Sequence, residues 1–423
     1  MWRKSATLVF LFIILFPCIA QDTKSLQDAF LEAEYFFVQD DYPDALPEYL
    51  RIHEKLPGNA NIAYRIGVCY LNLEGKKNLS VSYLEKASKN ITARHKEGTI
   101  AQVSAPYEAL LDLAKAYLVN YRFDEAKDTF RKYESTLLPD DSENRNFIEQ
   151  EINACDVARK MIANPVALTE ENLGSTVNDD KRNFNPVISG DGNTLAFMVS
   201  MKFYDAIMVT KLVKGKWTIP VNITPELQSD GDMFISCLSA DGKTLFLSRD
   251  DNFNSDLYTS SFDGSKWQQT AKLNKNINTK YWESHGVVTD DGNKLIFASD
   301  RPGGYGGLDL YYSVKVNGDW GPAVNLGPDI NTPFNEDRPF IINGQTLFFS
   351  SQGHENMGGY DLFKCEMQKD NKWTRPINLG YPLNTPDDNI YFMPVENGKA
   401  GYCSMYKEKE GYGNEDIYKV TFR

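Results

Sequence analysis

Five short turns recur at nearly regular intervals through the second half of the chain and constrain its fold more than any other feature. They lie 50, 50, 52 and 54 residues apart and are Asp191-Gly192, Asp241-Gly242, Asp291-Gly292, Asn343-Gly344 and Asn397-Gly398. Asn or Asp followed by Gly tolerates positive φ at both positions, which is typical of two-residue hairpins. Because alternating apolar segments flank each turn, this half consists of five antiparallel repeats.

A column of aspartates follows the turns, each one before an apolar pair such as Leu-Tyr. The column consists of Asp205, Asp256, Asp309, Asp361 and Asp416. A tryptophan follows on the next expected strand in four repeats, so each repeat supplies about four strands, as one propeller blade does. An aspartate in every repeat favours a structural role, accepting backbone N–H groups at a turn. A set of cation sites built from carboxylates and loop carbonyls is the alternative.

The two ends of this half complement each other. The fifth repeat stops at Arg423 without its outer strand, and the missing stretch, residues 164–174, stands before the first turn. We therefore predict a five-bladed propeller over residues 164–423, closed by pairing of its first strand with its last three. Closure removes exposed sheet edges, which otherwise promote aggregation.

Residues 25–163 show helical instead of alternating periodicity. A period near 34 places small, aromatic, Ala and Pro residues where tetratricopeptide repeats have them, at Ala33, Phe36, Ala45, Tyr49, Ile52 and Pro57 in the first unit and at Gly67, Tyr70, Ala114, Tyr117, Ala126 and Phe130 in the next two. The region resembles a tetratricopeptide solenoid, interrupted by a long loop over 94–106. The fold class expected is therefore α+β multidomain, an all-α solenoid followed by an all-β propeller, and such solenoids bind peptides or helices in a groove.

The first twenty residues resemble a secretory signal peptide. Arg3 and Lys4 precede the apolar run Leu8 to Phe16, and small residues allow cleavage after Ala20. Lipoprotein processing at Cys18 is the alternative, although Pro17 stands where such signals have a small residue. The chain is thus expected to be exported, to the periplasm or the outer membrane, with no membrane span in the mature form.

Charge and cysteine content exclude several classes of partner. The net charge is −13 without any run of basic residues, which argues against nucleic acid and against anionic membrane surfaces. The cysteines of the mature chain are scattered without metal or disulfide spacing, so we expect buried thiols, no metal site and no cofactor.

The glycine-rich stretch Ser299 to Ser313 leads into a strand, whereas a phosphate-binding loop has to lead into a helix. It connects the second and third strands of its blade, and the equivalent connections in the last two blades are also rich in glycine. Each of the three contains a tyrosine, Tyr305, Tyr360 or Tyr412. Aromatic side chains on loops of one face are expected to contact a partner there.

Two glutamates are candidates for catalytic groups in the centre of the propeller. Glu283 and Glu336 begin two innermost strands and are candidate carboxylates of a central funnel, as glycosidases require. Asn183 and Asn389 occupy the same column, which favours a structural polar position. No GxSxG motif is present, and the histidines are far apart, with His285 the one that could face the channel. We therefore expect a protein that is not an enzyme.

The turn segments, such as Ser239-Ala-Asp-Gly-Lys-Thr-Leu-Phe-Leu-Ser-Arg, resemble the WD40-like, TolB-type propeller repeat. With the helical region and the signal peptide, the chain is similar to envelope proteins of the Bacteroidetes, including a peptidoglycan-associated component of the type IX secretion system. The resemblance implies a scaffold that binds envelope proteins through its groove and a propeller face. Those proteins continue into an OmpA-like domain that has no counterpart here, so peptidoglycan contact stays open. The alternative function is a propeller that binds or cleaves glycans or peptidoglycan, with Glu283 and Glu336 in its funnel.

Overall fold

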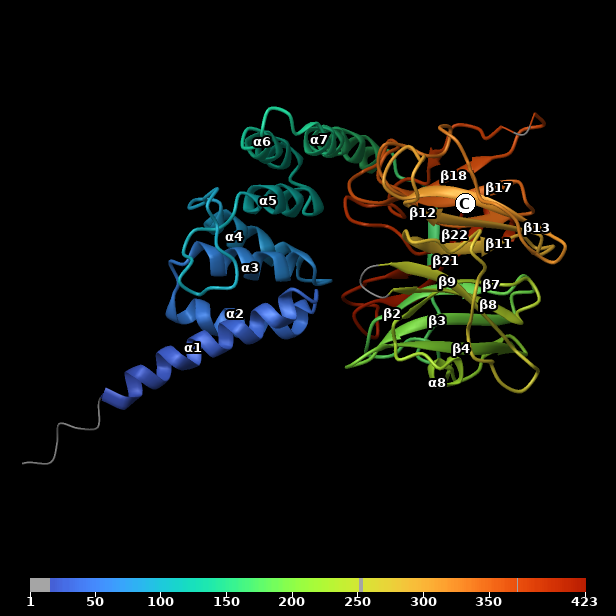
Figure 1. Ribbon diagram of the computed structural model, residues 1–423, viewed down its shortest axis with the longest axis horizontal. Helices are drawn as coiled ribbons and strands as arrows, with labels where there is room; N and C mark the ends of the chain where they lie inside the picture. Colours follow the sequence, from blue (N-terminus) through green and yellow to red (C-terminus); the bar gives the residue numbers. More distant parts are fainter. Residues whose placement is uncertain (1–15, 251–253, 371) are drawn as a thin grey trace, which may run out of the picture. The chain divides into compact units, whose positions relative to one another are not determined.

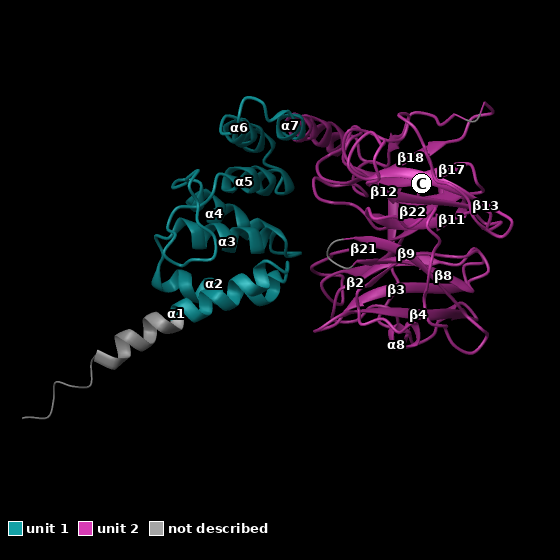
Figure 2. Ribbon diagram, viewed as in Figure 1, with its two compact units in different colours: residues 1–148 teal, residues 149–423 magenta. Residues whose placement is uncertain are grey.

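The structure is a computed structural model that describes residues 16–250, 254–370 and 372–423 (Figure 1). Most of the expected signal peptide, residues 1–15, lies outside the described residues. No helix in the described ranges has the length and apolar character needed to cross a membrane. The described residues form two compact units that divide between residues 148 and 149 (Figure 2), within helix α7, and the domain boundary after residue 163 stays a prediction.

The first unit is a stack of helical hairpins. Consecutive helices pack as the pairs α1 with α2, α3 with α4, and α5 with α6, and each pair contacts the next. Side-chain caps start some of them, since Asn59 Oδ1 accepts the Ile62 N–H at 3.0 Å. The helices are α1 Phe16–Phe37, α2 Tyr42–Lys55, α3 Ala60–Leu71, α4 Lys77–Ala87, α5 Glu108–Val119, α6 Phe123–Glu134 and α7 Ser142–Ala163.

Small residues allow the paired helices to approach closely. Ala33 and Ala114 are fully buried. A Cβ on Gly67 would lie 2.5 Å from Leu84 Cγ, and Leu84 is itself fully buried, so α3 and α4 could not keep their separation with a larger residue there. Large side chains such as Phe30 and Tyr49 fill the core of the first two hairpins.

The second unit is a five-bladed propeller, as predicted. The five sheets have four or five strands each, and the innermost strands β2, β7, β11, β16 and β20 contact one another in a closed ring. Blade 1 contains β2 Asn183–Ile188, β3 Thr194–Ser200, β4 Asp205–Val213, β5 Lys216–Trp217 and β6 Val221–Asn222, followed by helix α8 Thr224–Leu227. Blade 2 contains β7 Met233–Leu238, β8 Thr244–Asp250, β9 Ser255–Ser261 and β10 Ala271–Lys272.

Blades 3 to 5 follow the same order. Blade 3 contains β11 Glu283–Val288, β12 Lys294–Ser299, β13 Asp309–Val316, β14 Asp319–Trp320 and β15 Val324–Asn325. Blade 4 contains β16 Glu336–Ile342, β17 Thr346–Ser351, β18 Asp361–Glu366 and β19 Ile377–Asn378. Blade 5 contains β20 Phe392–Val395, β21 Ala400–Met405, β22 Asp416–Phe422 and, from the start of the propeller, β1 Leu168–Asn172. A short 3-10 helix, Glu396–Gly398, joins β20 to β21.

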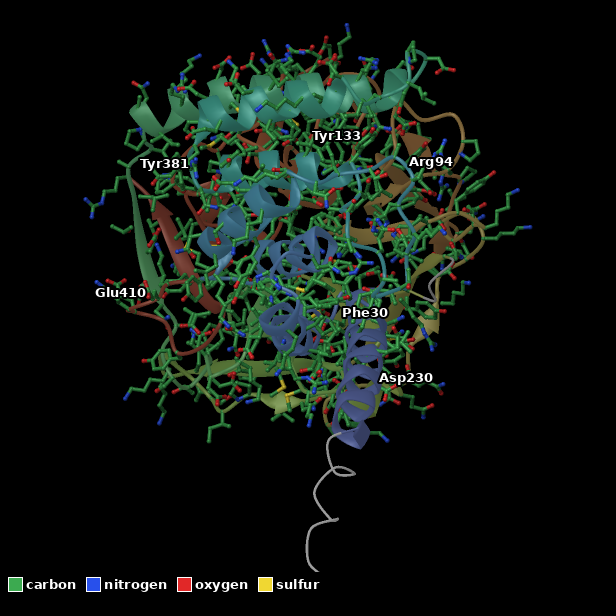
Figure 3. The ribbon with its side chains drawn as sticks, turned by 90° about the vertical axis from the view of Figure 1, so that its left-hand side faces the viewer. Phe30, Arg94, Tyr133, Asp230, Tyr381 and Glu410 are labelled. Carbon is green, nitrogen blue, oxygen red and sulfur yellow. The ribbon has the colours of Figure 1, made fainter. Side chains whose placement is uncertain are left out.

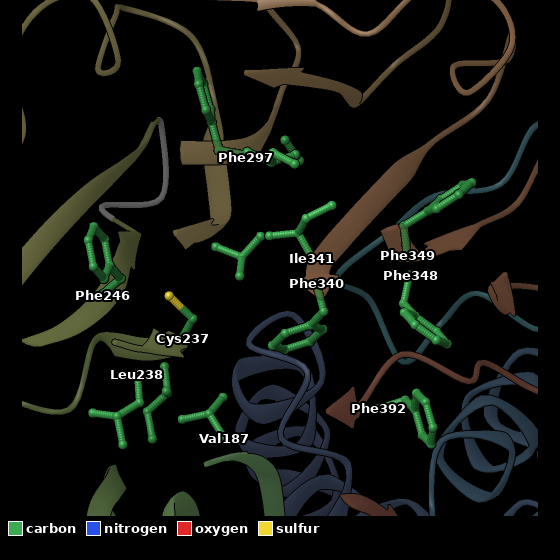
Figure 4. Packing of buried hydrophobic residues seen from close by; sticks show 14 of the residues in the cluster. Val187, Cys237, Leu238, Phe246, Phe297, Phe340, Ile341, Phe348, Phe349 and Phe392 are labelled. Atoms are coloured by element: carbon green, nitrogen blue, oxygen red, sulfur yellow. The ribbon is translucent and has the colours of Figure 1, made fainter. Parts of the chain in front are cut away.

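The predicted ring closure is confirmed. Strand β1 pairs antiparallel with β22 in the register Leu168↔Phe422 to Asn172↔Tyr418, and it occupies the outer edge of the sheet β1-β22-β21-β20. Inside the ring, apolar residues of the inner strands and their neighbours pack together, among them Val187, Cys237, Phe340 and Phe392 (Figure 4). This continuous core holds the five blades as one body.

The hairpin turns match the predicted two-residue type only in part. In blades 1 to 3 only the glycine has positive φ, and in blade 1 the loop spans residues 190–193, because the Ser189 N–H donates to Thr194 O at 2.9 Å. In this loop the Asp191 side chain accepts hydrogen bonds that a backbone carbonyl would otherwise accept. Its Oδ1 accepts from Ser189 Oγ at 2.6 Å and from the Asn193 N–H at 2.9 Å. In blades 4 and 5 the asparagine preceding the glycine also has positive φ.

Candidate functional site

The repeated aspartates anchor the connections between second and third strands. Asp309 Oδ2 accepts the Tyr305 N–H at 2.6 Å and Asn325 Nδ2 at 2.8 Å. The same pair of contacts recurs in blade 4 from Met357 and Asn378 to Asp361, and in blade 5 from Tyr412 and Asn172 to Asp416. Burial raises the pKa of Asp361 well above its usual value, against the effect of the hydrogen bond from Asn378.

A second asparagine, in the segment that leads to the next blade, contacts the first asparagine and the third strand of each of these blades. In blade 3, Asn331 Nδ2 donates to Asn325 Oδ1 at 2.8 Å, and Asn331 Oδ1 accepts the Leu310 N–H at 2.7 Å. Asn384 and Asn178 make the equivalent contacts in blades 4 and 5. In blade 2 the partner of the aspartate is a cation instead, since Lys272 forms an ion pair with Asp256. In blade 1 burial raises the pKa of Asp205 above its usual value.

The glycines of Ser299–Ser313 fit tight packing within the loop. A Cβ on Gly306 would lie 2.2 Å from Phe334 O, and one on Gly304 would lie 2.3 Å from Asp309 Oδ2. Gly413 occupies the equivalent position in blade 5, where a Cβ would lie 2.1 Å from Lys181 O. Backbone atoms cannot give way, so positions 306 and 413 require glycine, whereas at Gly304 the neighbouring atom belongs to the Asp309 side chain.

The three loop tyrosines differ in exposure. Tyr305 and Tyr412 are each 50% exposed, whereas Tyr360 is partly buried and its N–H donates to Asp388 Oδ1 at 2.8 Å. Phe203, in the equivalent connection of blade 1, is 86% exposed and was not singled out from the sequence. Its loop has no glycine cluster, so only the alignment of the five repeats could have identified it. Among the described residues, three blades therefore present an exposed aromatic side chain on the same face of the ring.

Glu283 and Glu336 are fully buried and bound to the turns that precede their strands. Glu336 accepts from the Thr332 N–H and from Thr332 Oγ1, each at 2.7 Å, and from Ser351 Oγ at 2.7 Å. Glu283 makes the same contacts with Thr279 and Ser299. These donors belong to the same blade as each glutamate or to the turn that leads into it, so both carboxylates are directed at their own blades.

One cation distinguishes these two sites. Arg301 Nη2 lies 3.1 Å from Glu283 Oε1 and donates to Ile277 O at 2.6 Å. In blade 4 the bond to the equivalent carbonyl is made by His354 Nε2, 2.8 Å from Ile330 O, and no described residue forms a salt bridge with Glu336. Burial consequently raises the pKa of Glu336 to about 7, against the opposing hydrogen bonds from Thr332 and Ser351.

A polar cluster lies one residue further along the inner strands. We call it the axial cluster: Ser284 and His285 of β11, Asp337 and Arg338 of β16, and Tyr391, which precedes β20. Asp337 accepts from Ser284 Oγ at 2.9 Å and lies 3.2 Å from His285 Nδ1. Arg338 stacks over the Tyr391 ring at 4.3 Å. The cluster therefore links three blades around the ring.

Two pKa values in the axial cluster are shifted downward, those of Asp337 and His285. Burial raises the pKa of Asp337, but contacts with His285 and Arg338 reverse this and lower it to about 2. Burial and Arg338 lower the pKa of His285, and its Nε2 is buried without a hydrogen-bond partner among the described residues. His285 and Arg338 also have positive φ, at 33° and 49°, which side chains other than glycine rarely adopt.

The assignment of Glu283 and Glu336 as funnel carboxylates stays a prediction. The sequence pattern identified the column of Glu283 and Glu336, whereas the charged side chains that meet across blades belong to the next two residues, Asp337 and Arg338. A bulge between residues 337 and 340 shifts the register, and nothing in the residue pattern marks it. Among the described residues no group of acids, histidines and cysteines is arranged for a metal, and the cysteines at 69, 155, 237, 365 and 403 are buried thiols.

Comparison with known proteins gives similarity at the level of the fold. No family model matches the chain, and no curated protein matches it. TolB from Acinetobacter baumannii is 14% identical with a TM-score of 0.40, over 65% of this chain and 70% of that one. An α-L-arabinofuranosidase from Lactobacillus brevis is 15% identical with a TM-score of 0.40, over 57% and 91%. A thermostable family-43 glycoside hydrolase is 12% identical with a TM-score of 0.39, over 58% and 91%.

These matches correct one expectation. The sequence led us to expect a protein that is not an enzyme, yet solved structures similar to this chain include glycoside hydrolases. A fold by itself does not decide between catalysis and binding. At these identities no residue role or activity is transferred to this chain.

Proposed function

We propose that the chain is an interaction scaffold of the cell envelope, whose propeller binds other envelope proteins through the face that carries Phe203, Tyr305 and Tyr412. The observation that carries this proposal is the combination of exposure and anchoring at two of these loops. Tyr305 and Tyr412 are half exposed, while their backbone N–H groups are held by Asp309 and Asp416 at 2.6 and 2.7 Å. Aromatic side chains on ordered loops lose little conformational entropy on binding, which suits them as anchors.

The helical unit is proposed to be a tetratricopeptide-like solenoid that supplies a second binding surface. Its stacked hairpins and the small residues between paired helices support this assignment. The resemblance of the sequence to Bacteroidetes envelope proteins supports a role accessory to type IX secretion or gliding, with the protein in the periplasm or at the outer membrane.

Crosslinking and affinity capture of the tagged full chain from its own envelope test the proposal. Secretion or gliding components should be recovered with the wild type, and recovery should fall at least about tenfold with the double variant Tyr305→Ser and Tyr412→Ser. Val316→Ser is the matched control, because Val316 is also about half exposed but lies at the other end of β13 from Asp309. Equal recovery with both variants would contradict use of this propeller face.

Glycan binding is the second candidate and is favoured by the axial cluster. Planar polar side chains beside aromatic rings, here His285, Arg338 and Tyr391, are the groups that hold sugars in protein sites. Retention of the full chain on cell-wall sacculi and on a panel of oligosaccharides tests this candidate. Retention that Arg338→Ala abolishes and Tyr305→Ser leaves unchanged would favour glycan binding over the scaffold.

A further inference from the structure

The connection between α4 and α5 folds back onto the first two hairpins. We call residues 94–104 the strap; Arg94, labelled in Figure 3, begins it. Its base is closed by hydrogen bonds between the Thr92 N–H and Ala105 O and between the Ala105 N–H and Asn90 O, each 2.9 Å long. The strap is therefore a loop with fixed ends whose middle lies against other helices of the same unit.

The start of α3 binds two consecutive carbonyls of the strap. The Asn61 N–H donates to Val103 O at 3.0 Å, and Asn59 Nδ2 donates to Gln102 O at 3.2 Å. His95 Nε2 lies 2.9 Å from Asn61 Oδ1. Ile100 packs against the apolar cluster of α1, α2 and α3. These contacts combine backbone recognition with one aliphatic anchor, as peptide-binding sites do.

The strap also contributes to a polar network that runs through the first two hairpins. Arg65 Nη2 donates to Glu34 Oε2 at 2.9 Å, and Arg65 Nη1 donates to Asn61 Oδ1 at 3.2 Å. The Gly98 N–H faces the Glu34 carboxylate from the strap side and helps to lower its pKa. Arg65 and Asn61 are almost fully buried, so the strap helps to shield these polar groups from water.

The strap satisfies this network incompletely. Asn61 Nδ2 is buried and has no hydrogen-bond partner among the described residues. The amide orientation is fixed, because Arg65 can only donate to the oxygen. An unmet buried donor costs about 1–3 kcal/mol, which a chain segment with a carbonyl at this point would recover. Much of the strap is exposed, including Arg94, Lys96 and Val103, so few contacts oppose its release.

We propose that the strap is a built-in occupant of a peptide site on the helical unit, and that a peptide segment of a partner protein binds there by displacing it. The inference deepens the proposed scaffold function and rests on it for the existence of a partner. The contacts define the segment: a residue with a free N–H for Glu34, an aliphatic side chain at the position of Ile100, and two carbonyls beyond it for Asn59 and Asn61. A further carbonyl would reach Asn61 Nδ2.

Calorimetric titration with a synthetic peptide of residues 92–106 tests the proposal. The protein is the full chain in which 94–104 are replaced by glycine and serine at equal length, compared with the wild type. The replaced chain should bind the peptide saturably, and the wild type at least about tenfold more weakly, because its tethered strap competes at a millimolar effective concentration. The control peptide carries Ile100→Asp and should not bind.

Two results would overturn the proposal: no saturable binding to the folded replaced chain up to about 1 mM peptide, or equal binding of both peptides. Because the replaced chain could misfold, the intact chain with Ile100→Asp serves as a second receptor, and its helical circular dichroism is checked first. This experiment uses no envelope component. Peptide binding with no envelope partner captured would uphold the peptide site and reject the envelope scaffold. Capture of envelope partners without peptide binding would support the scaffold and reject the peptide site.

Discussion

Asn172 and Asp416, which lie 244 residues apart in the sequence, are joined by a hydrogen bond of 2.8 Å between Asn172 Nδ2 and Asp416 Oδ2. The same bond in blade 3, from Asn325 to Asp309, joins residues only 16 apart. The contact that stabilises one loop within a blade thus also fastens the two ends of the propeller to each other.

Removing the donor of this bond should destabilise the propeller. Asn172→Ala leaves the buried Asp416 carboxylate without one of its two donors, so we expect the free energy of unfolding to fall by about 1–3 kcal/mol. Asn193→Ala is the control, since Asn193 contacts an exposed aspartate and should cost less than about 0.5 kcal/mol. Denaturant unfolding measures both losses of free energy. Equal losses would show that the bond between Asn172 and Asp416 stabilises the propeller no more than an exposed contact does.

Proline substitutions in strand β1 test its pairing with β22, because each one removes a single backbone N–H. The Leu173 N–H donates to Ile417 O and the Arg423 N–H to Ala167 O, so the alternation of an antiparallel ladder directs the Glu171 N–H into β22 and the Glu170 N–H outward. Glu171→Pro should lower the melting temperature of the propeller by several degrees.

Glu170→Pro is the matched control and should change the melting temperature much less. It disturbs the ion pair of Glu170 with Lys407, a partly exposed pair of small energetic value. A larger loss with Glu170→Pro than with Glu171→Pro would contradict the observed register.

The buried carboxyl of Glu336 should make stability depend on pH. Its pKa rises from an ordinary value of 4.5 to about 7 on folding. The stabilisation from protonated Glu336 is therefore complete below about pH 4.5 and is lost as the pH rises through about 7, a change on the order of 3 kcal/mol.

Unfolding of the wild type and of Glu336→Gln, compared at pH 4.5 and pH 8, measures this change. The free energy of unfolding of the wild type should fall relative to that of Glu336→Gln as the pH rises from 4.5 to 8. His354→Arg offers a second check, because it would place a cation where Arg301 stands beside Glu283 and should weaken the pH dependence. A constant difference across this range would refute the raised pKa.

The glycine-rich loop of blade 3 should be intolerant of even one methyl group. Gly306→Ala places a Cβ 2.2 Å from Phe334 O, and we expect a loss of about 3 kcal/mol. Gly303→Ala, which meets no neighbour but has a φ of 94°, should cost about 1 kcal/mol from backbone strain alone. Thermal unfolding distinguishes the two, and equal losses would mean that strain, not contact, governs the loop.

The sequence predicted most of the architecture because the repeats are redundant. Five aligned units revealed the blades, and the displaced stretch 164–174 revealed how they close. The candidate site was harder to predict, since Asp337 and Arg338 meet His285 and Tyr391 only through bulges and contacts between blades. The strap was visible as an interruption over 94–106, but its seat on Asn59 and Asn61 depends on tertiary packing.

The pairing of β1 with β22 also sets the order in which the propeller can mature. Strand β1 leaves the ribosome early and has no partner until Asp416–Phe422, at the other end of the propeller sequence, has been synthesised. Pairing across so large a separation in sequence is slow, because a long loop must close before any contact rewards it. A nascent chain interrupted before its last blade would expose unpaired strand edges, so this fold makes completeness of translation a condition of solubility.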